Sequence, residues 1–157
     1  MSALSSDLLN EDCVMMNVRA ENKEDLLAKI CEYACKKGYV EDGYLTALLE
    51  RENEFPTGLP TEIIKVAVPH AIDNSRVIKS GIFIARLAEP IAFKEMGDGE
   101  NDVMAEIIFL LVIKSGEDQG AVLKSIMGMF ADTNALSALK PAETPREIIE
   151  VILNRRA

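Results

Sequence analysis

A single histidine stands where the residue types best fit group-transfer chemistry. His70 is the only histidine among 157 residues, and it directly follows the apolar run 66–68 and Pro69. A proline fixes its own φ and favours extended geometry in the residue before it. We therefore expect a strand that ends here and presents the imidazole at its edge. A neutral imidazole is nucleophilic near pH 7, so this side chain can receive a phosphoryl group.

Two polar side chains upstream fit the same chemistry. Arg51 supplies a fixed cation, and Thr57 supplies a hydroxyl inside a turn that Pro56 and Gly58 favour. A cation, a hydroxyl and loop N–H groups together could surround a phosphoryl group. The alternative is structural: Arg51 falls in the last turn of an expected helix, where a cation suits the helix dipole. His70 would then be a satisfied histidine beside a turn.

Length and composition indicate one globular domain. A chain of 157 residues is typical of one domain, so we expect a single domain over residues 1–157. The residues are 48% hydrophobic and include no tryptophan, which predicts an aliphatic core. A formal charge of −9 argues against nucleic acid or an anionic membrane as partner. It matches a basic protein partner, or it serves solubility alone.

The cysteines and acidic residues do not form a metal-binding pattern. Cys13, Cys31 and Cys35 contain no CxxC pair, and Cys31 and Cys35 are spaced as small core residues of one helix. The acids at 98–102 alternate as in a calcium loop but lack its remaining ligands. The start does not read as a signal peptide, and the longest apolar run, 107–113, is too short to span a bilayer. We therefore expect a reduced, cytoplasmic protein with no metal, no cofactor and no membrane insertion.

Hydrophobic periodicity predicts strands that alternate with helices. Strands are expected at 13–18, 66–68, 80–87, 91–93 and 103–113, and a turn at Glu89 and Pro90. Helices are expected from the cap Asn22 to 37, at 41–52, after the cap Ser115, at 133–139 and from Pro145 onward. The continuous apolar end of 103–113 indicates a strand buried on both faces. This order predicts an α/β fold with a mixed β-sheet sandwiched between helices.

Three motifs, in this order and spacing, resemble one known family. They are Arg51-Glu52, Pro56-Thr57-Gly58-Leu59 and Ala67-Val68-Pro69-His70. They resemble the type-2 IIA components of the sugar phosphotransferase system (PTS), the fructose–mannitol class. The resemblance covers residues 8–153 and implies the fold of the mannitol IIA domain. Within the class, residues 54–58 and 101–103 most resemble the galactitol branch.

The resemblance implies a phosphocarrier. His70 would accept a phosphoryl group at Nε2 from phospho-HPr and pass it to a cysteine of a IIB component. That component would phosphorylate galactitol or a related sugar during uptake. Arg51, Thr57 and the amide of Gln119 would support the phosphoryl group. Thr57 could equally be a plain turn residue, and Gln119 a plain first-turn residue. The mannitol and nitrogen-regulatory branches have a second histidine where Gln119 stands, which puts in doubt any mechanism that needs a second imidazole.

Two other functions stay open at this point. A regulatory IIA-like module, whose phosphorylation state controls a partner protein, would share the acceptor motifs. A gene neighbourhood with IIB and IIC components would favour transport, and one with a transcription regulator would favour sensing. The remaining alternative is a folded domain whose histidine is only structural. The sequence does not name the polyol, because the membrane component binds the sugar in this system.

Overall fold

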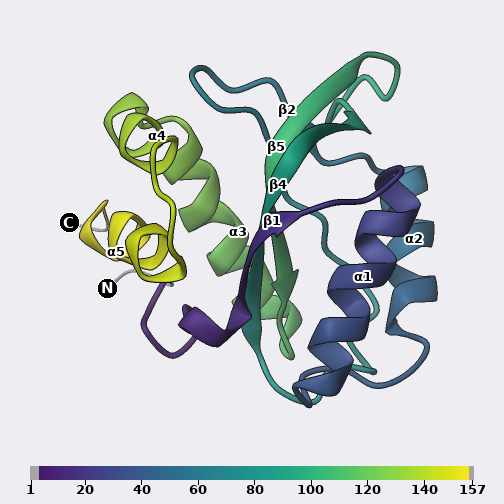
Figure 1. Ribbon diagram of the computed structural model, residues 1–157. Helices are drawn as coiled ribbons and strands as arrows, with labels where there is room; N and C mark the ends of the chain where they lie inside the picture. The colour runs from purple at the N-terminus through teal and green to yellow at the C-terminus, as the bar shows by residue number, and fades with distance from the viewer. Residues whose placement is uncertain (1–3, 156–157) are drawn as a thin grey trace.

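The computed structural model describes residues 4–155, which form one five-stranded sheet covered by helices (Figure 1). In spatial order the strands are β1 (Val14–Val18), β4 (Gly81–Lys94), β5 (Asp102–Val112), β3 (Val66–Ala67) and β2 (Gly58–Leu59). The pairs β1–β4 and β3–β5 are parallel, whereas β4–β5 and β2–β3 are antiparallel. The predicted mixed sheet is confirmed.

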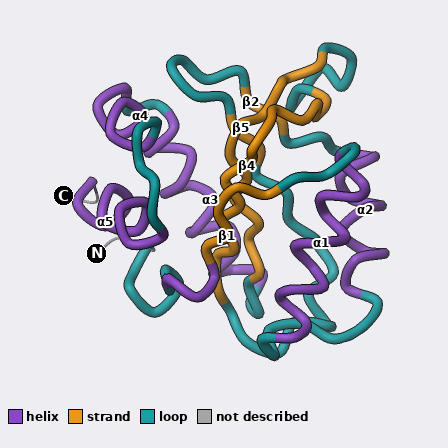
Figure 2. The backbone as a smooth tube through the Cα atoms, viewed as in Figure 1, coloured by secondary structure: helices purple, strands orange, loops and turns teal. Residues whose placement is uncertain are grey.

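Two groups of helices cover the two faces of the sheet, as Figures 1 and 2 show. One face carries α1 (Lys23–Lys36) and α2 (Tyr44–Glu54). The other carries α3 (Gly116–Phe130), α4 (Thr133–Leu139) and α5 (Pro145–Arg155). A 3-10 helix, Glu11–Cys13, leads into β1. The predicted sandwich of a sheet between helices is therefore confirmed.

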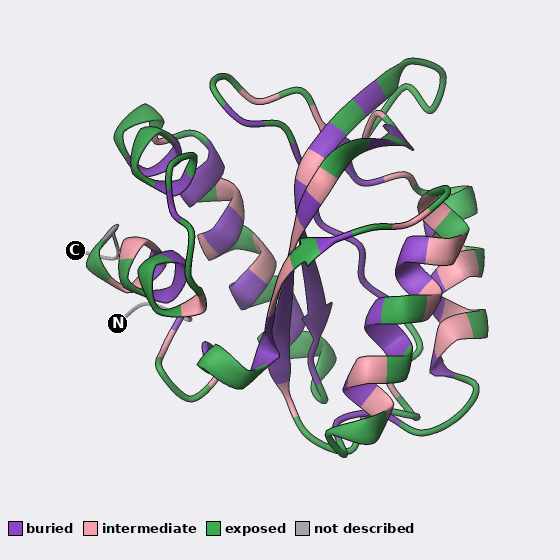
Figure 3. Ribbon diagram, in the orientation of Figure 1, coloured by how far each residue is buried: buried purple, intermediate pink, exposed green. Residues whose placement is uncertain are grey.

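Strand β5 is shared by two hydrophobic cores. Its alternate residues Phe109 and Leu111 pack in the core beneath α3, α4 and α5. The residues between and beside them, Ile108 and Leu110, pack in the core beneath α1 and α2. All four side chains are fully buried, and Figure 3 shows that buried residues fill the centre of the sheet. Each such side chain contributes about 1.5–3 kcal/mol of burial free energy, so β5 fixes the frame on which the loops are carried.

The helix starts follow the caps. The side chain of Asn22 accepts the Asp25 N–H and that of Ser115 accepts the Asp118 N–H, as predicted for α1 and α3. Helix α2 begins at Tyr44, later than predicted. The residue before it, Gly43, has φ 96°, a left-handed conformation that cannot lie inside an α-helix.

The turn predicted at Glu89 and Pro90 is wrong, because β4 runs through both residues as one strand. The pairing of β1 with β4 ends at Leu87, so a proline beyond that point removes no N–H from the β1–β4 ladder. The register against β5 shifts between Arg86 and Ile91, and this irregularity accommodates the proline.

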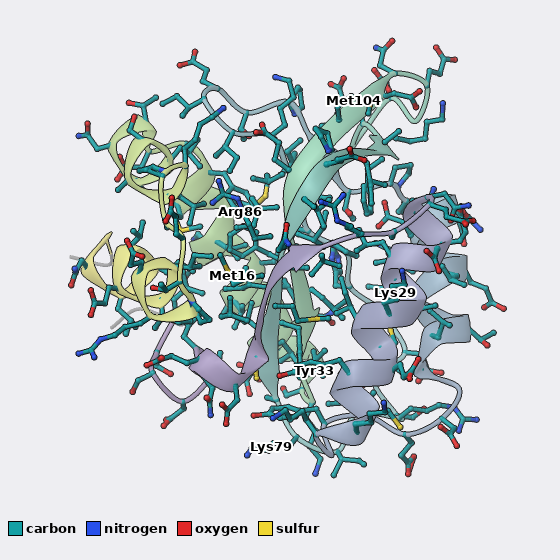
Figure 4. The ribbon with its side chains drawn as sticks, viewed as in Figure 1. Met16, Lys29, Tyr33, Lys79, Arg86 and Met104 are labelled. Atoms are coloured by element: carbon teal, nitrogen blue, oxygen red, sulfur yellow. The ribbon has the colours of Figure 1, made fainter. Side chains whose placement is uncertain are left out.

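Arg86 attaches the link between α4 and α5 to the sheet. Figure 4 shows it on the side of β4 that faces these helices. Its guanidinium donates to the carbonyls of Leu139, Lys140 and Ala142, at the C-terminal end of α4, where a cation suits the helix dipole. Lys140 donates in turn to the carbonyl of Ile63 at 2.6 Å. The helical layer is thus tied to the loop between β2 and β3.

We predict that Ile63→Asn stabilises the protein. Ile63 has φ 70°, a conformation that costs a β-branched residue roughly 1–2 kcal/mol and that asparagine tolerates. The side chain is 41% exposed, so little burial is lost. Urea denaturation should show a rise of about 1 kcal/mol in the free energy of unfolding. The control Ile72→Asn, at a 58% exposed residue with ordinary φ, should not rise. If Ile63→Asn loses as much stability as the control, Ile63 is not strained.

Candidate functional site

His70 lies just beyond β3, alongside β5. It forms an isolated parallel bridge with Leu111, whose N–H donates to the carbonyl of Pro69 at 3.1 Å. The residue is only 7% exposed. The imidazole expected at the edge of a strand is therefore largely covered, because β5 extends past the end of β3 and holds this segment against the sheet.

One hydrogen bond assigns the tautomer of His70. Its Nδ1 lies 2.8 Å from the carbonyl oxygen of Val68. A carbonyl oxygen only accepts, so Nδ1 carries the proton and Nε2 keeps the lone pair. Nε2 is the nucleophilic atom of this ring.

The surroundings also set the charge of the ring. Burial lowers the pKa of His70 from its ordinary value of 6.5, and the positive charge of Arg51 lowers it further. The bond to Val68 acts in the opposite direction, because it favours the protonated ring. The net shift is downward, so the ring is neutral and nucleophilic at pH 7.

Arg51 brings a cation to the same place from the last turn of α2. Its guanidinium lies over the ring of Phe55, 4.0 Å from the centroid. Among the residues that the structure describes, Arg51 Nε is a buried side-chain nitrogen with no hydrogen-bond partner. A buried N–H without an acceptor costs about 1–3 kcal/mol. An anion that enters beside Arg51 would supply the acceptor.

A cavity of about 540 Å³ joins three of the four residues that the sequence singled out. His70, Arg51 and Thr57 all line it. Residues 54–56, the loop at 96–99 and Leu123 of α3 complete the wall. From the sequence, the acids at 98–102 were compared only with a calcium loop. The place of this segment in the cavity wall follows from long-range packing, and its glycines and acids are the local signals of a loop.

Gly58 brings that loop against the site. The Met96 N–H donates to the carbonyl of Gly58 at 2.8 Å. A Cβ built on Gly58 would lie 2.7 Å from the carbonyl oxygen of Lys94. Only glycine allows the two backbones to approach this closely, so this residue of the Pro-Thr-Gly motif is fixed by packing.

Thr57 is held by a buried carboxylate. Its N–H donates to Glu52 Oε2 at 2.9 Å, and its hydroxyl donates to Glu52 Oε1 at 2.8 Å. The hydroxyl proton therefore points at Glu52. A direct donation to a phosphoryl group, as expected from the sequence, would require this bond to open. Glu52 was quoted in the Arg-Glu motif but given no role.

Gln119 reaches the chain one residue after His70. It lies in the first turn of α3 and is 7% exposed, and its Nε2 donates to the carbonyl of Ala71 at 2.8 Å. Gln119 is not one of the described residues that line the cavity. An amide nitrogen carries two hydrogens, and this bond uses one of them. In the structure, Gln119 holds the backbone beside His70.

The cysteines are packed rather than reactive. All three thiols are free, Cys13 and Cys31 are buried, and burial raises the pKa of Cys31 to about 12. The expectation of a core role is thus confirmed for Cys31, whereas Cys35 is only half-buried. Within residues 4–155 no group of three or more His, Cys, Asp or Glu could hold a metal ion. No helix in that part of the chain is long and apolar enough to cross a membrane.

Comparison with known proteins gives a consistent result. The family model described as "Phosphoenolpyruvate-dependent sugar phosphotransferase system, EIIA 2" matches residues 7–155. The galactitol-specific EIIA component of Escherichia coli K12 is 27% identical over 118 residues, which are 75% of this chain and 77% of that protein. The mannitol-specific IIA component of Geobacillus stearothermophilus is 26% identical over 153 residues, 95% and 97% of the two chains.

Two solved structures share the fold at 25% identity. The crystal structure of mannitol IIA from Escherichia coli has a TM-score of 0.73 and covers 92% of this chain and 98% of its own. The complex of mannitol IIA with phosphorylated mannitol IIB from the same organism has a TM-score of 0.76, with 94% and 98% covered. Galactitol- and mannitol-specific relatives are about equally similar, so the sugar is not distinguished.

We predict that the imidazole of His70 titrates below pH 6.5 and that Arg51→Ala raises its pKa. Removal of the cation stabilises the protonated ring, but the pKa should stay below 6.5 because burial is the larger cause. NMR of the ¹³C- and ¹⁵N-labelled imidazole over a pH series measures this without ambiguity, because the sequence has one histidine. Arg146→Ala, which removes an exposed arginine of α5, is the control and should leave the pKa unchanged. A fall in pKa in Arg51→Ala would contradict the electrostatic account.

Proposed function

The chain belongs to the EIIA 2 family of the phosphoenolpyruvate-dependent sugar phosphotransferase system, and from this premise we propose that His70 is its phosphoryl acceptor. Components of this family are phosphoryl-transfer carriers within a sugar or polyol system. One observation carries the proposal: a neutral, tautomer-fixed imidazole and a buried guanidinium N–H without an acceptor line the same cavity. We propose that residues 1–157 act as one such component.

The proposed reaction is a relay in two steps. Nε2 of His70 attacks the phosphorus of phospho-HPr, a P–N bond forms, and the P–N bond to HPr breaks with its electron pair returning to that imidazole. A cysteine thiolate of a IIB component then attacks the phosphorus, and the bond to Nε2 breaks. Through both steps Nδ1 keeps its proton and donates a hydrogen bond to the Val68 carbonyl. That bond stabilises the positive charge that the ring gains when Nε2 is phosphorylated.

The cavity supplies the charge stabilisation that this chemistry needs. A phosphoryl group brings about two negative charges and three strong acceptor oxygens. In the proposed relay the positive charge of Arg51 stabilises the phosphoryl group, and its planar guanidinium donates hydrogen bonds to the phosphoryl oxygens. Phosphoryl transfer depends mainly on positioning and electrostatics, so the residues of the cavity are sufficient in kind. We assign supporting roles to Thr57 and Gln119, whose observed bonds hold the segments on either side of His70.

The proposed partners are HPr as donor and a IIB component as acceptor. The second is supported by the solved complex of mannitol IIA with phosphorylated IIB, which shares this fold. The formal charge of −9 suits partners with basic surfaces, because opposite charge speeds encounter. The proposed final acceptor of the phosphoryl group is galactitol or a related sugar, in line with the 27% identity to a galactitol-specific component.

The central prediction is that the protein gains one phosphoryl group on incubation with phosphoenolpyruvate, enzyme I and HPr. A phosphoramidate on imidazole is labile in acid and survives alkali, whereas serine and threonine esters behave the other way. The label should therefore vanish in mild acid, persist in alkali and map to the peptide around His70, as mass spectrometry can show.

His70→Gln should abolish labelling. Because His70 is nearly buried, this variant keeps a polar side chain of similar reach, and circular dichroism checks that it folds. A variant without its three cysteines is the control and should still be labelled. An acid-stable label, labelling of folded His70→Gln, or no labelling of the folded wild type with its cognate HPr would overturn the proposed function.

We also predict that Arg51→Ala slows phosphoryl acceptance by about a hundredfold, the scale of losing one preorganised donor to a developing anion. Arg51→Lys keeps the charge but not the planar fork, so it should recover part of the rate. Quench-flow with phospho-HPr gives both rates, and Arg146→Ala again serves as control. Equal rates in wild type and Arg51→Ala would reduce Arg51 to a cation that suits the end of α2.

A further inference from the structure

We propose that Glu52 is a positioning residue for the phosphoryl acceptor, acting through Thr57 and Val68 to fix the tautomer and orientation of the His70 imidazole. The inference rests on the proposed function of His70. No atom of Glu52 needs to touch the phosphoryl group, since a continuous line of hydrogen bonds joins its carboxylate to the ring.

The line begins at a carboxylate that is almost completely buried. Glu52 is 1% exposed, and a charge in such a place is costly unless it is hydrogen-bonded. Both of its oxygens accept from one residue, Thr57, through the backbone N–H and the hydroxyl. This two-point contact fixes the turn after α2 in position and in rotation, which a single bond would not do.

The line of hydrogen bonds then passes from Thr57 through Val68 to the imidazole ring. The carbonyl of Thr57 accepts the Val68 N–H at 3.2 Å, and the carbonyl of Val68 accepts the His70 Nδ1–H at 2.8 Å. Thr57 and Val68 are 2% and 0% exposed, so water does not compete at these bonds. A turn that shifts would carry Val68 with it, and the carbonyl that selects the tautomer would move.

The charges around Glu52 fit an acceptor. Burial is the largest influence on the pKa of Glu52 and the net shift is upward, while the two bonds from Thr57 and the positive charge of Lys23 oppose it. Lys23 lies in the first turn of α1, so a second helix supplies a charge that favours the carboxylate. The neighbouring residue Arg51 faces the cavity instead. The two residues of the Arg-Glu motif therefore have different tasks: Arg51 would bind the phosphoryl group, and Glu52 holds Thr57 in position.

The competing explanation is that Glu52 only closes the C-terminal end of α2. In that case its loss would lower stability and leave the imidazole unchanged. The state of the imidazole separates the two explanations, and it can be read without any phosphoryl transfer.

The experiment compares Glu52→Gln and Thr57→Val with the matched control Thr61→Val. Thr61 lies in the loop between β2 and β3, and its hydroxyl donates to the Ile64 carbonyl, outside the line to His70. In ¹⁵N NMR at pH 8, wild type and Thr61→Val should show the Nδ1–H tautomer of the single histidine. Glu52→Gln and Thr57→Val should show a mixture of tautomers and a changed imidazole pKa.

The second readout is the rate of phosphoryl acceptance from phospho-HPr. A misplaced nucleophile should slow Glu52→Gln and Thr57→Val by about tenfold or more, with Thr61→Val near the wild-type rate. Thr57→Ser keeps the hydroxyl and should restore both the tautomer and the rate.

The outcomes separate this proposal from the proposed function. If folded Thr57→Val and Glu52→Gln keep the wild-type tautomer, the positioning role is overturned, even when His70 is labelled normally. If one variant does not fold, the other still decides, because each removes a different end of the same contact. If the tautomer shifts as expected but wild type accepts no phosphoryl group, the link to His70 stands and the proposed function falls.

Discussion

The Nδ1–H of His70 donates a hydrogen bond to the carbonyl of Val68, and the chemistry of the cavity depends on that bond. It leaves the lone pair on Nε2 and keeps the ring in one orientation. The carbonyl can do this because Val68 is itself fixed, on one side by Thr57 and on the other by the run of β3 beside β5. Strand β5 is in turn fixed by two cores. His70 is therefore held beside a strand that is buried on both faces, although it lies outside regular secondary structure itself.

Arg51 meets two opposite demands with one charge. Before transfer its cation lowers the pKa of His70 and so keeps the ring neutral. After transfer, in the proposed relay, the same cation faces a group with about two negative charges. Stacking on Phe55 holds the guanidinium at the cavity, where its buried Nε has no partner of its own. In the proposed relay, a site arranged in this way would change its interactions without having to change its shape.

The fold could be predicted from the sequence because its signals are local. Each signal lies within a single helix or strand, such as the apolar run of β5 and the caps Asn22 and Ser115. The order of these elements then indicates the fold class. The prediction of a turn at Pro90 failed because a strand tolerates a proline where no neighbouring strand needs its N–H. The sequence does not show that β1 has already ended beside Pro90. The pairing of Arg51 with His70 was suggested by the chemistry of the residues and strengthened by a resemblance of motifs. The spacing of residues in the sequence does not show that the end of α2 lies beside the segment after β3, because β3 itself pairs with β5.

Two parts of the site were missed: Glu52, which is only five residues from its partner Thr57, and the 96–99 loop, which long-range contacts bring to the site. Glu52 and the 96–99 loop contact Thr57 and Gly58, and the latter contact depends on the register of β4 and β5. No local pattern reports that register. The hydroxyl of Thr57 also has a buried partner, Glu52, that the sequence did not indicate.

The extended hairpin of β4 and β5 gives the cavity an unequal stiffness (Figure 1). Phe93 and Val103 are the last buried pair of this ribbon, and the chain beyond them is held by the Met96 N–H on Gly58 and by a bond between Glu95 and Asn101. The wall that carries His70 is anchored in the core, whereas the opposite wall is held by backbone bonds, by the bonds that Asp98 accepts from Glu100 and Asn101, and by the exposed Lys94–Asp102 ion pair. In the proposed relay, this less anchored wall would adjust to the different shapes of the donor and the acceptor. His70 would keep its position beside β5 while the outer wall moved.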